Sequence, residues 1–197
     1  MLDCQVSLLN YMATMHFLSG EDPYPIGNSH FVHVPYNTYR CQDGFIVIAV
    51  ITDNFWQNLK QVVNCAAFDD PALDGQPGRW ADREMINATL SDVLKDRSCS
   101  HWLTLLEAQR IPCAPVNNFS QALSDPQVRH RNMVVELGHP NGAKTRGPGN
   151  PIKLSRTCEE SFAPAPTLGQ NTDEVFSTLL GYSVGEIDDL RSRGVIA

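Results

Sequence analysis

The sequence predicts an α+β protein in which helices and short antiparallel strands follow one another along 197 residues. Apolar residues recur at helical spacing in several segments, and apolar, β-branched runs flank turn dipeptides. Hydrophobic residues make up 42% of the chain, which is enough to bury a core. We therefore expect one large domain or two smaller ones.

A helix followed by a β-hairpin is predicted near the N-terminus. Ser7 is a suitable N-cap and Gly20 a suitable end for a helix whose apolar positions are Leu8, Leu9, Met12, Met15 and Leu18. After a Pro-rich connector, residues 38–50 contain the turn pair Asp43-Gly44 followed by a β-branched run. This segment predicts two antiparallel strands.

Three more helices are predicted in the middle of the chain. The first spans 52–63, with Thr52 or Asp53 as its cap, and the others lie around 82–94 and 100–109. Each places its apolar residues on one face, so each is expected to pack against a common core.

Loops and strands are predicted from composition elsewhere. Residues 66–80 are rich in Pro and Gly and are predicted to be a loop, whereas 113–117 form a short strand. The region 133–155 indicates strands around a tight Asn141-Gly142 turn.

The C-terminal segment is predicted to be helical. Two pairs have the spacing of a capping box, and two glycines stand where helices would end; these residues are Asn171 with Glu174, Ser183 with Glu186, Gly181 and Gly194.

The charge balance argues against nucleic acid or an anionic membrane as the main partner. The formal net charge is −7, and such partners favour dense Lys and Arg. The longest apolar run, residues 45–51, is too short to span a bilayer, and no signal-peptide pattern is present. We expect a cytoplasmic protein, or an organellar one lacking its transit sequence.

No metal, phosphate or dinucleotide motif is indicated. His30 and His33 have a spacing compatible with metal ligands, but the nearest carboxylates precede a Pro-rich turn, so we expect no metal site. The glycine patterns of phosphate and dinucleotide loops are incomplete. Reduced, mostly packed thiols are expected for the six widely spaced cysteines Cys4, Cys41, Cys65, Cys99, Cys113 and Cys158.

The polar, His-containing stretch GNSHFVHVPYN, residues 27–37, lies between the first helix and the hairpin. The residues alone leave two interpretations open, an active-site loop or a connector into the next strand.

Several stretches, taken in order, carry a resemblance to a known family. GNSHFVHVPYNTYRCQDGFIVIAV, NFWQNL, IPCAPVNNFSQALSDPQVRHRNMVVEL, GNPIKLS, PAPTLGQNTDEV and the final LRSRGVI resemble the C-terminal half of the family III CoA-transferases. That family includes formyl-CoA and carnitine CoA-transferases, with 2-methylacyl-CoA racemase as a relative.

The resemblance implies a domain organisation. In the family, a Rossmann-like large domain is built from both ends of the chain, with a small α+β domain inserted between them, and two subunits interlock as a dimer. Mapped here, residues 1–34 leave the large domain, 35–125 form the small domain, and 126–197 return to the large domain and complete it.

The resemblance also implies acyl transfer through an aspartate nucleophile. In the family, this carboxylate attacks an acyl-CoA thioester, and CoA is then passed to an acceptor carboxylic acid. The nucleophile lies upstream of the segment that resembles residues 1–10, and none of Asp3, Asp22 or Asp43 occupies its place. We therefore expect no catalytic aspartate in this chain, and no activity from the chain alone.

The resemblance assigns the polar loop to the acyl site. Gly27, Asn28, Ser29 and His30 fall where the formyl-CoA enzyme has a glycine-rich loop that closes over the acyl-aspartyl intermediate. His30 would orient the acceptor carboxylate. This chain has one glycine where that enzyme has several, so the mobility of the loop is expected to differ.

Three functions follow as alternatives. The first is the C-terminal portion of a CoA-transferase that acts on acyl-CoA and a carboxylic acid, with coenzyme A as substrate and with a homo-oligomer or an N-terminal half as partner. The second is a non-catalytic binding or structural module. The third, ranked lower, is part of a 2-methylacyl-CoA racemase.

Overall fold

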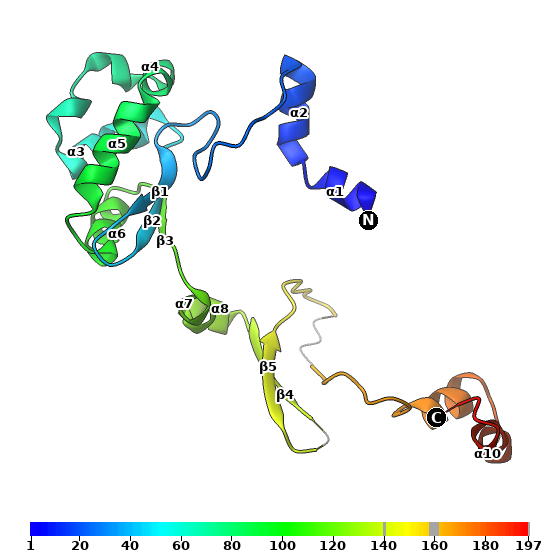
Figure 1. The fold of residues 1–197 in the computed structure, drawn as a ribbon. Coiled ribbons are helices and arrows are strands. Elements are labelled where there is room, and N and C mark those ends of the chain that lie inside the picture. The colour runs from blue at the N-terminus through cyan, green and yellow to red at the C-terminus, as the bar shows by residue number, and fades with distance from the viewer. Residues whose placement is uncertain (140, 158–161, 197) are drawn as a thin grey trace. The chain divides into compact units, whose positions relative to one another are not determined.

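Helices and short antiparallel strands build both of the units into which the chain divides, Met1–Val116 and Asn117–Ala197 (Figure 1). The computed structural model describes residues 1–139, 141–157 and 162–196. Because each unit combines helices with a small sheet, the predicted α+β class is confirmed.

The predicted hairpin is present in the first unit. Strands β1 (Tyr36–Arg40) and β2 (Phe45–Ala49) pair antiparallel. The backbone N–H of Cys41 donates to the carbonyl of Gly44 at 2.8 Å and closes the turn. The turn pair in the sequence therefore located the hairpin correctly.

A third strand completes this sheet and borders the core. Strand β3 (Cys113–Pro115) pairs antiparallel with β2, so the order is β1-β2-β3. Alternate residues of β2 face the core, as expected for a sheet with one covered face. Fully buried core side chains include Ile46, Ile48, Trp56, Leu59, Leu90 and Leu106.

Three helices gather beside this sheet, as Figure 1 shows. They are α3 (Asp53–Val63), α5 (Arg83–Leu94) and α6 (Cys99–Ala108), close to the predicted ranges. The Thr52 and Ser98 side chains cap α3 and α6 by accepting backbone N–H groups. Helix α5 contacts β1, and α6 contacts β2 and β3, so the apolar faces meet in one core.

The prediction of a loop over residues 66–80 is wrong. This segment contains two 3₁₀ turns, η1 (Ala66–Phe68) and η2 (Pro71–Asp74), and then helix α4 (Gln76–Ala81). Proline is tolerated in the first turn of a helix, because its missing N–H has no partner there in any case. Tertiary packing then stabilises a helix that the local composition disfavours.

The first predicted helix is two helices, α1 (Leu2–Ser7) and α2 (Asn10–Ser19). Ser7 is therefore the last residue of α1 and not an N-cap. The break follows from Asn10, whose φ of 50° lies in the left-handed region that Asn tolerates. Gly20, with φ of 74°, ends α2 as predicted.

The second unit contains the second predicted hairpin. Strands β4 (Val134–Gly138) and β5 (Lys144–Pro148) pair antiparallel around the Asn141-Gly142 turn. Gly142 has φ of 83°, a conformation that a side chain would strain. Pro140 lies outside the described residues.

Two short helices before this hairpin were not predicted. They are α7 (Phe119–Ser124) and α8 (Pro126–His130). Asn118 and Gln121 form a capping box at α7, and this spacing was a signal available in the sequence.

The C-terminal segment is helical, as predicted. It contains α9 (Thr172–Glu174), the π-helical turn η3 (Val175–Leu179) and α10 (Val184–Ser192). The predicted capping box at Ser183 is present at α10. The one predicted at Asn171 is not formed, because its amide donates to Glu174 instead of accepting a backbone N–H.

Within the described ranges, no helix is long and apolar enough to cross a membrane. Cys158 lies outside these ranges. The other five cysteines are free thiols, with Cys41 buried and Cys4 exposed.

Candidate functional site

The polar loop, residues 27–37, follows α2 and the Pro-rich connector, ends with the first two residues of β1 and closes on itself. Gly27 has φ of 68°, which lets the chain turn after the Pro-rich connector. The Asn37 amide donates to Ser29 Oγ at 2.9 Å, and the His30 backbone N–H donates to the Tyr36 carbonyl, also at 2.9 Å. These bonds tie the beginning of the loop to the start of β1.

His30 organises the turn of the loop. Its Nδ1 accepts the backbone N–H groups of Val32 at 3.0 Å and His33 at 3.1 Å. Its ring stacks on Phe31 and Tyr36, with centroids 4.5 and 5.0 Å away. Burial and, next, the charge of His33 lower the pKa of His30 below 6.5. Because Nδ1 is an acceptor, the proton of the neutral ring is on Nε2.

Helix α4 holds the second half of the loop. The Gln76 side-chain amide donates to the Val32 carbonyl, and Arg79 Nε donates to the Val34 carbonyl at 2.9 Å. Arg79 is fully buried, and its Nη2 pairs with Asp53 at 2.7 Å. The charge-assisted bonds of this guanidinium fix the loop against α3 and α4.

A cavity of about 240 Å³ opens beside the loop, and we name it the loop pocket. Arg83 lies over the Trp80 ring at 5.0 Å and donates to the Trp80 carbonyl at 3.2 Å. The Tyr39 hydroxyl donates to Asn87 Oδ1 at 2.5 Å. Twelve residues line the loop pocket: Tyr24, Pro25, Ile26, Ser29, His30, His33, Val34, Tyr36, Trp80, Arg83, Glu84 and Asn87.

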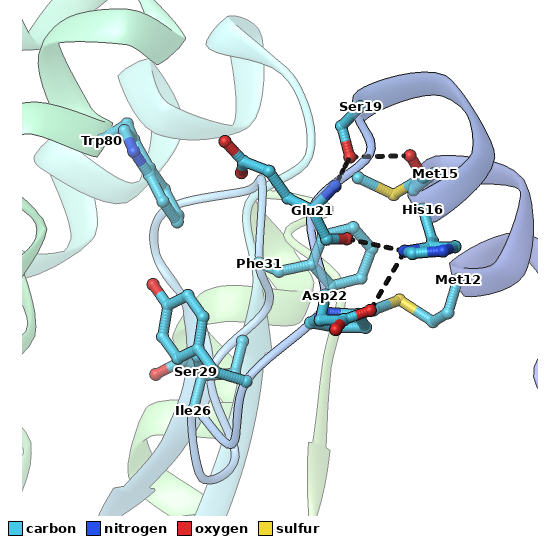
Figure 2. Close-up of a pocket in the computed structure, with 12 residues that line it drawn as sticks. Met12, Met15, His16, Ser19, Glu21, Asp22, Ile26, Ser29, Phe31 and Trp80 are labelled. Carbon is cyan, nitrogen blue, oxygen red and sulfur yellow. Dashed lines mark hydrogen bonds and ion pairs between the residues drawn. The ribbon is translucent and has the colours of Figure 1, made fainter.

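A second cavity, of about 420 Å³, lies between α2 and Trp80, and we name it the α2 pocket (Figure 2). Met12 and Met15 line it from the helix, opposite Trp80. His16 Nδ1 donates to the Glu21 carbonyl at 3.0 Å and lies 3.2 Å from a carboxylate oxygen of Asp22. The two pockets share Tyr24, Ile26, Ser29 and Trp80.

The four residues predicted for the acyl site lie at different places in this arrangement. Ser29 lines both pockets and His30 lines the loop pocket. Gly27 and Asn28 belong to the same loop but line neither pocket. Asp22 borders the α2 pocket, whereas Asp43 accepts the Cys99 backbone N–H at 2.7 Å in the hairpin turn.

Sequence reasoning missed the residues that α4 and α5 contribute. Arg83 and Asn87 are four residues apart on α5 and so share a face, a spacing that could have singled them out. Arg79 could not have been found, because the partner of its Nε is 45 positions away in the sequence. Among the described residues, no group of three or more His, Cys, Asp or Glu side chains could hold a metal ion.

The chain has counterparts among known proteins. The sequence profile of CoA-transferase family III matches residues 1–172. The chain therefore belongs to this family, which confirms the resemblance found in its sequence.

Particular relatives support the same assignment. The chain is 27% identical over its full length to human succinyl-CoA:glutarate CoA-transferase, of which it covers 45%. Over 181 residues, 89% of this chain, it is 32% identical to the succinyl-CoA:mesaconate CoA-transferase of Haloarcula marismortui and covers 44% of it.

A solved structure has the same fold. A CAIB/BAIF family protein from Brucella suis matches with a TM-score of 0.73 and 25% identity, over 90% of this chain and 46% of that chain. This chain thus spans less than half the length of these relatives.

Proposed function

We propose that this chain is the C-terminal portion of a CoA-transferase that moves CoA between an acyl-CoA and a carboxylic acid. Family membership over residues 1–172 is the observation that carries the proposal. The loop pocket supports it, because the loop assigned to the acyl site by resemblance borders a cavity with several polar side chains.

The proposed reaction uses a carboxylate nucleophile. An aspartate attacks the thioester carbonyl of the donor, the C–S bond breaks, and an acyl-aspartyl anhydride and CoA thiolate form. The thiolate attacks the aspartyl carbonyl, which releases the donor acid and leaves an aspartyl-CoA thioester. The acceptor carboxylate repeats these steps in reverse and departs as its own CoA thioester.

In this proposal the chain shields and positions the reacting groups. Loop residues Gly27, Asn28, Ser29 and His30 would lie at the acyl group, and exclusion of water would protect the anhydride from hydrolysis. The nucleophilic aspartate would come from a segment outside this chain. We therefore expect no transferase activity from residues 1–197 alone, and we propose the divisions 1–34, 35–125 and 126–197 for the assembled enzyme.

The names of the relatives suggest the class of substrate. They include succinyl-CoA:glutarate, succinyl-CoA:mesaconate and formyl-CoA:oxalate CoA-transferases. All of these acceptors are dicarboxylic acids, so we propose a dicarboxylic acid as the acceptor here.

Complementation tests this function. The chain is co-expressed with the part of human succinyl-CoA:glutarate CoA-transferase that lies outside the matched region, and glutaryl-CoA formed from succinyl-CoA and glutarate is measured by mass spectrometry. We expect turnover from the complex and none from either piece alone. A stable complex that forms no acyl-CoA product from any tested acid would favour the non-catalytic binding module.

A further inference from the structure

We propose that the loop pocket binds the non-reacting carboxylate of a dicarboxylic acid, with Arg83 as its ion partner and Asn87 Nδ2 and His30 Nε2 as hydrogen-bond donors. The identity of the acid rests on the proposed function. Binding of a carboxylate rests only on the side chains of the pocket.

The hydrogen bonds around His30 make it a donor toward a ligand. Its Nδ1 already accepts two backbone N–H groups, from Val32 and His33. An imidazole whose Nδ1 accepts must carry its proton on Nε2. His30 therefore offers an N–H to an anion without needing a positive charge.

The hydrogen bond from Tyr39 likewise makes the side chain of Asn87 a donor toward a ligand. The Tyr39 hydroxyl donates to Asn87 Oδ1 at 2.5 Å, and Tyr39 is almost fully buried. Burial raises the pKa of the phenol, so it stays protonated and keeps this direction. Because Oδ1 is occupied, the Nδ2 donors of Asn87 remain for a ligand of the loop pocket.

Arg83 supplies the positive charge. One Nη1 hydrogen bond to the Trp80 carbonyl and the stacking on the Trp80 ring hold the guanidinium in place. No ion pair joins Arg83 to a carboxylate in the described part of the chain. Its remaining donors have the planar arrangement that binds a carboxylate in bidentate fashion.

Two further features limit the ligand. The cavity of about 240 Å³ is smaller than the roughly 300–1,000 Å³ of drug-sized sites, so it suits a small acid. Glu84 also lines the pocket, and its exposed carboxylate would repel an anion.

A buried polar atom also points to a ligand in this pocket. His33 Nδ1 is buried and has no hydrogen-bond partner among the described residues, which is consistent with a ligand or water there.

The ion pair with Arg83 points to the non-reacting carboxylate. A carboxylate paired with a guanidinium is stabilised in its charged form and is therefore a poorer nucleophile. The reacting carboxylate must be free to attack an aspartyl thioester. Arg83 would thus distinguish dicarboxylic from monocarboxylic acids by binding the second carboxylate.

Binding to the purified chain is the first test, with glutarate and butyrate as matched probes titrated by NMR at low ionic strength. We expect saturating shifts of the residues that line the loop pocket with either acid, because the site binds one carboxylate and each probe presents at least one; shifts that do not saturate would refute the site. Arg83→Gln should lower the affinity for glutarate by roughly tenfold or more, as loss of a charge-assisted pair does. Glu84→Gln should raise it, because a repelling carboxylate is removed.

Asn87→Asp is the sharpest variant. It keeps an acceptor for the Tyr39 hydroxyl but replaces the two amide donors with a second carboxylate oxygen, so glutarate binding should be lost. An unchanged melting temperature shows that the fold is intact. If Asn87→Asp and Arg83→Gln both bind glutarate as the wild type does, the proposed site is wrong.

The complemented enzyme separates this inference from the proposed function. Arg83→Gln should raise KM for glutarate, and Arg83→Lys should restore part of the loss, since it keeps the charge without the bidentate geometry. Glutarate binding without turnover would refute the transferase function and leave the carboxylate site standing. Turnover with the same KM for wild type and Arg83→Gln would refute the site.

Discussion

At the level of single residues, the protonation state of His30 controls the hydrogen bonds of the polar loop. Its Nδ1 can accept the N–H groups of Val32 and His33 only while it is unprotonated. The pKa of His30 is lowered in the folded state, first by burial and then by the charge of His33, so the folded protein also favours the unprotonated ring. Protonation would leave two backbone N–H groups of the loop facing a third N–H.

The expected consequence is a loss of stability in acid. The unfolded imidazole protonates near pH 6.5 and the folded one only at lower pH. The contribution of His30 is therefore complete above pH 6.5 and is lost as the pH falls from 6.5 through the folded pKa, by at most about 1.4 kcal/mol per pH unit.

A melting series over about pH 4.5–8.5, roughly two units either side of 6.5, measures this effect. The melting temperature of the wild type should fall more steeply below pH 6.5 than that of His30→Asn, whose Oδ1 can accept the same N–H groups without titrating. His101→Asn, on the exposed face of α6, is the control and should follow the wild type. Parallel curves for wild type and His30→Asn would contradict the assigned role.

At the level of secondary-structure elements, helix α4 packs with its backbone directly against the backbone of η2 at Gly78. A Cβ added at Gly78 would lie 1.7 Å from the carbonyl oxygen of Ala72 in η2. The backbones of α4 and η2 therefore touch, and only glycine fits at this position. This contact places Gln76 and Arg79 at the carbonyls of the loop.

Gly78→Ala should destabilise the first unit by roughly 1–3 kcal/mol, because the overlap is with backbone and outweighs the better helix propensity of alanine. All three tryptophans, Trp56, Trp80 and Trp102, belong to this unit, so urea unfolding followed by tryptophan fluorescence reports on it.

Gly185→Ala is the matched control. Gly185 is also helical, in α10, and has no atom within 4 Å of an added Cβ. By far-UV circular dichroism this variant should be neutral or stabilising by up to about 1 kcal/mol. Equal effects of the two substitutions would mean that the contact between α4 and η2 is unimportant.

At the scale of the whole molecule, apolar side chains remain uncovered in each unit. Helices α1 and α2 bury no residue, and Phe17 and Leu18 are 82% and 84% exposed. In the second unit, Leu168 and Leu179 are 97% and 76% exposed. Exposed apolar surface of this kind marks sites of association.

We expect the isolated chain to self-associate or to bind an apolar dye. Light scattering and dye fluorescence on one sample measure both properties. Replacing Phe17 and Leu18 by Ser should reduce association without changing the melting of the first unit, since neither side chain belongs to its core. A monodisperse wild-type monomer that binds no dye would count against this expectation.

Both hairpins and most helices could be predicted because their signals are local. Asp43-Gly44 and Asn141-Gly142 fix turns, and Thr52 and Ser183 cap the helices that follow them. Each of these signals involves about four neighbouring residues or fewer, so it can be recognised from the sequence alone. The order of motifs along the chain likewise identified the family.

The candidate site is assembled by contacts between residues that are far apart in the sequence. Arg79 contacts Val34 across 45 positions, and Tyr39 contacts Asn87 across 48. Helix α4 exists in a Pro- and Gly-rich segment because it packs on η2. Local patterns cannot encode such pairs, since their geometry arises only when the core brings distant segments together. The residues alone thus specified the fold class, the two hairpin turns, the caps at Thr52 and Ser183 and the family, whereas packing places the side chains that surround the loop.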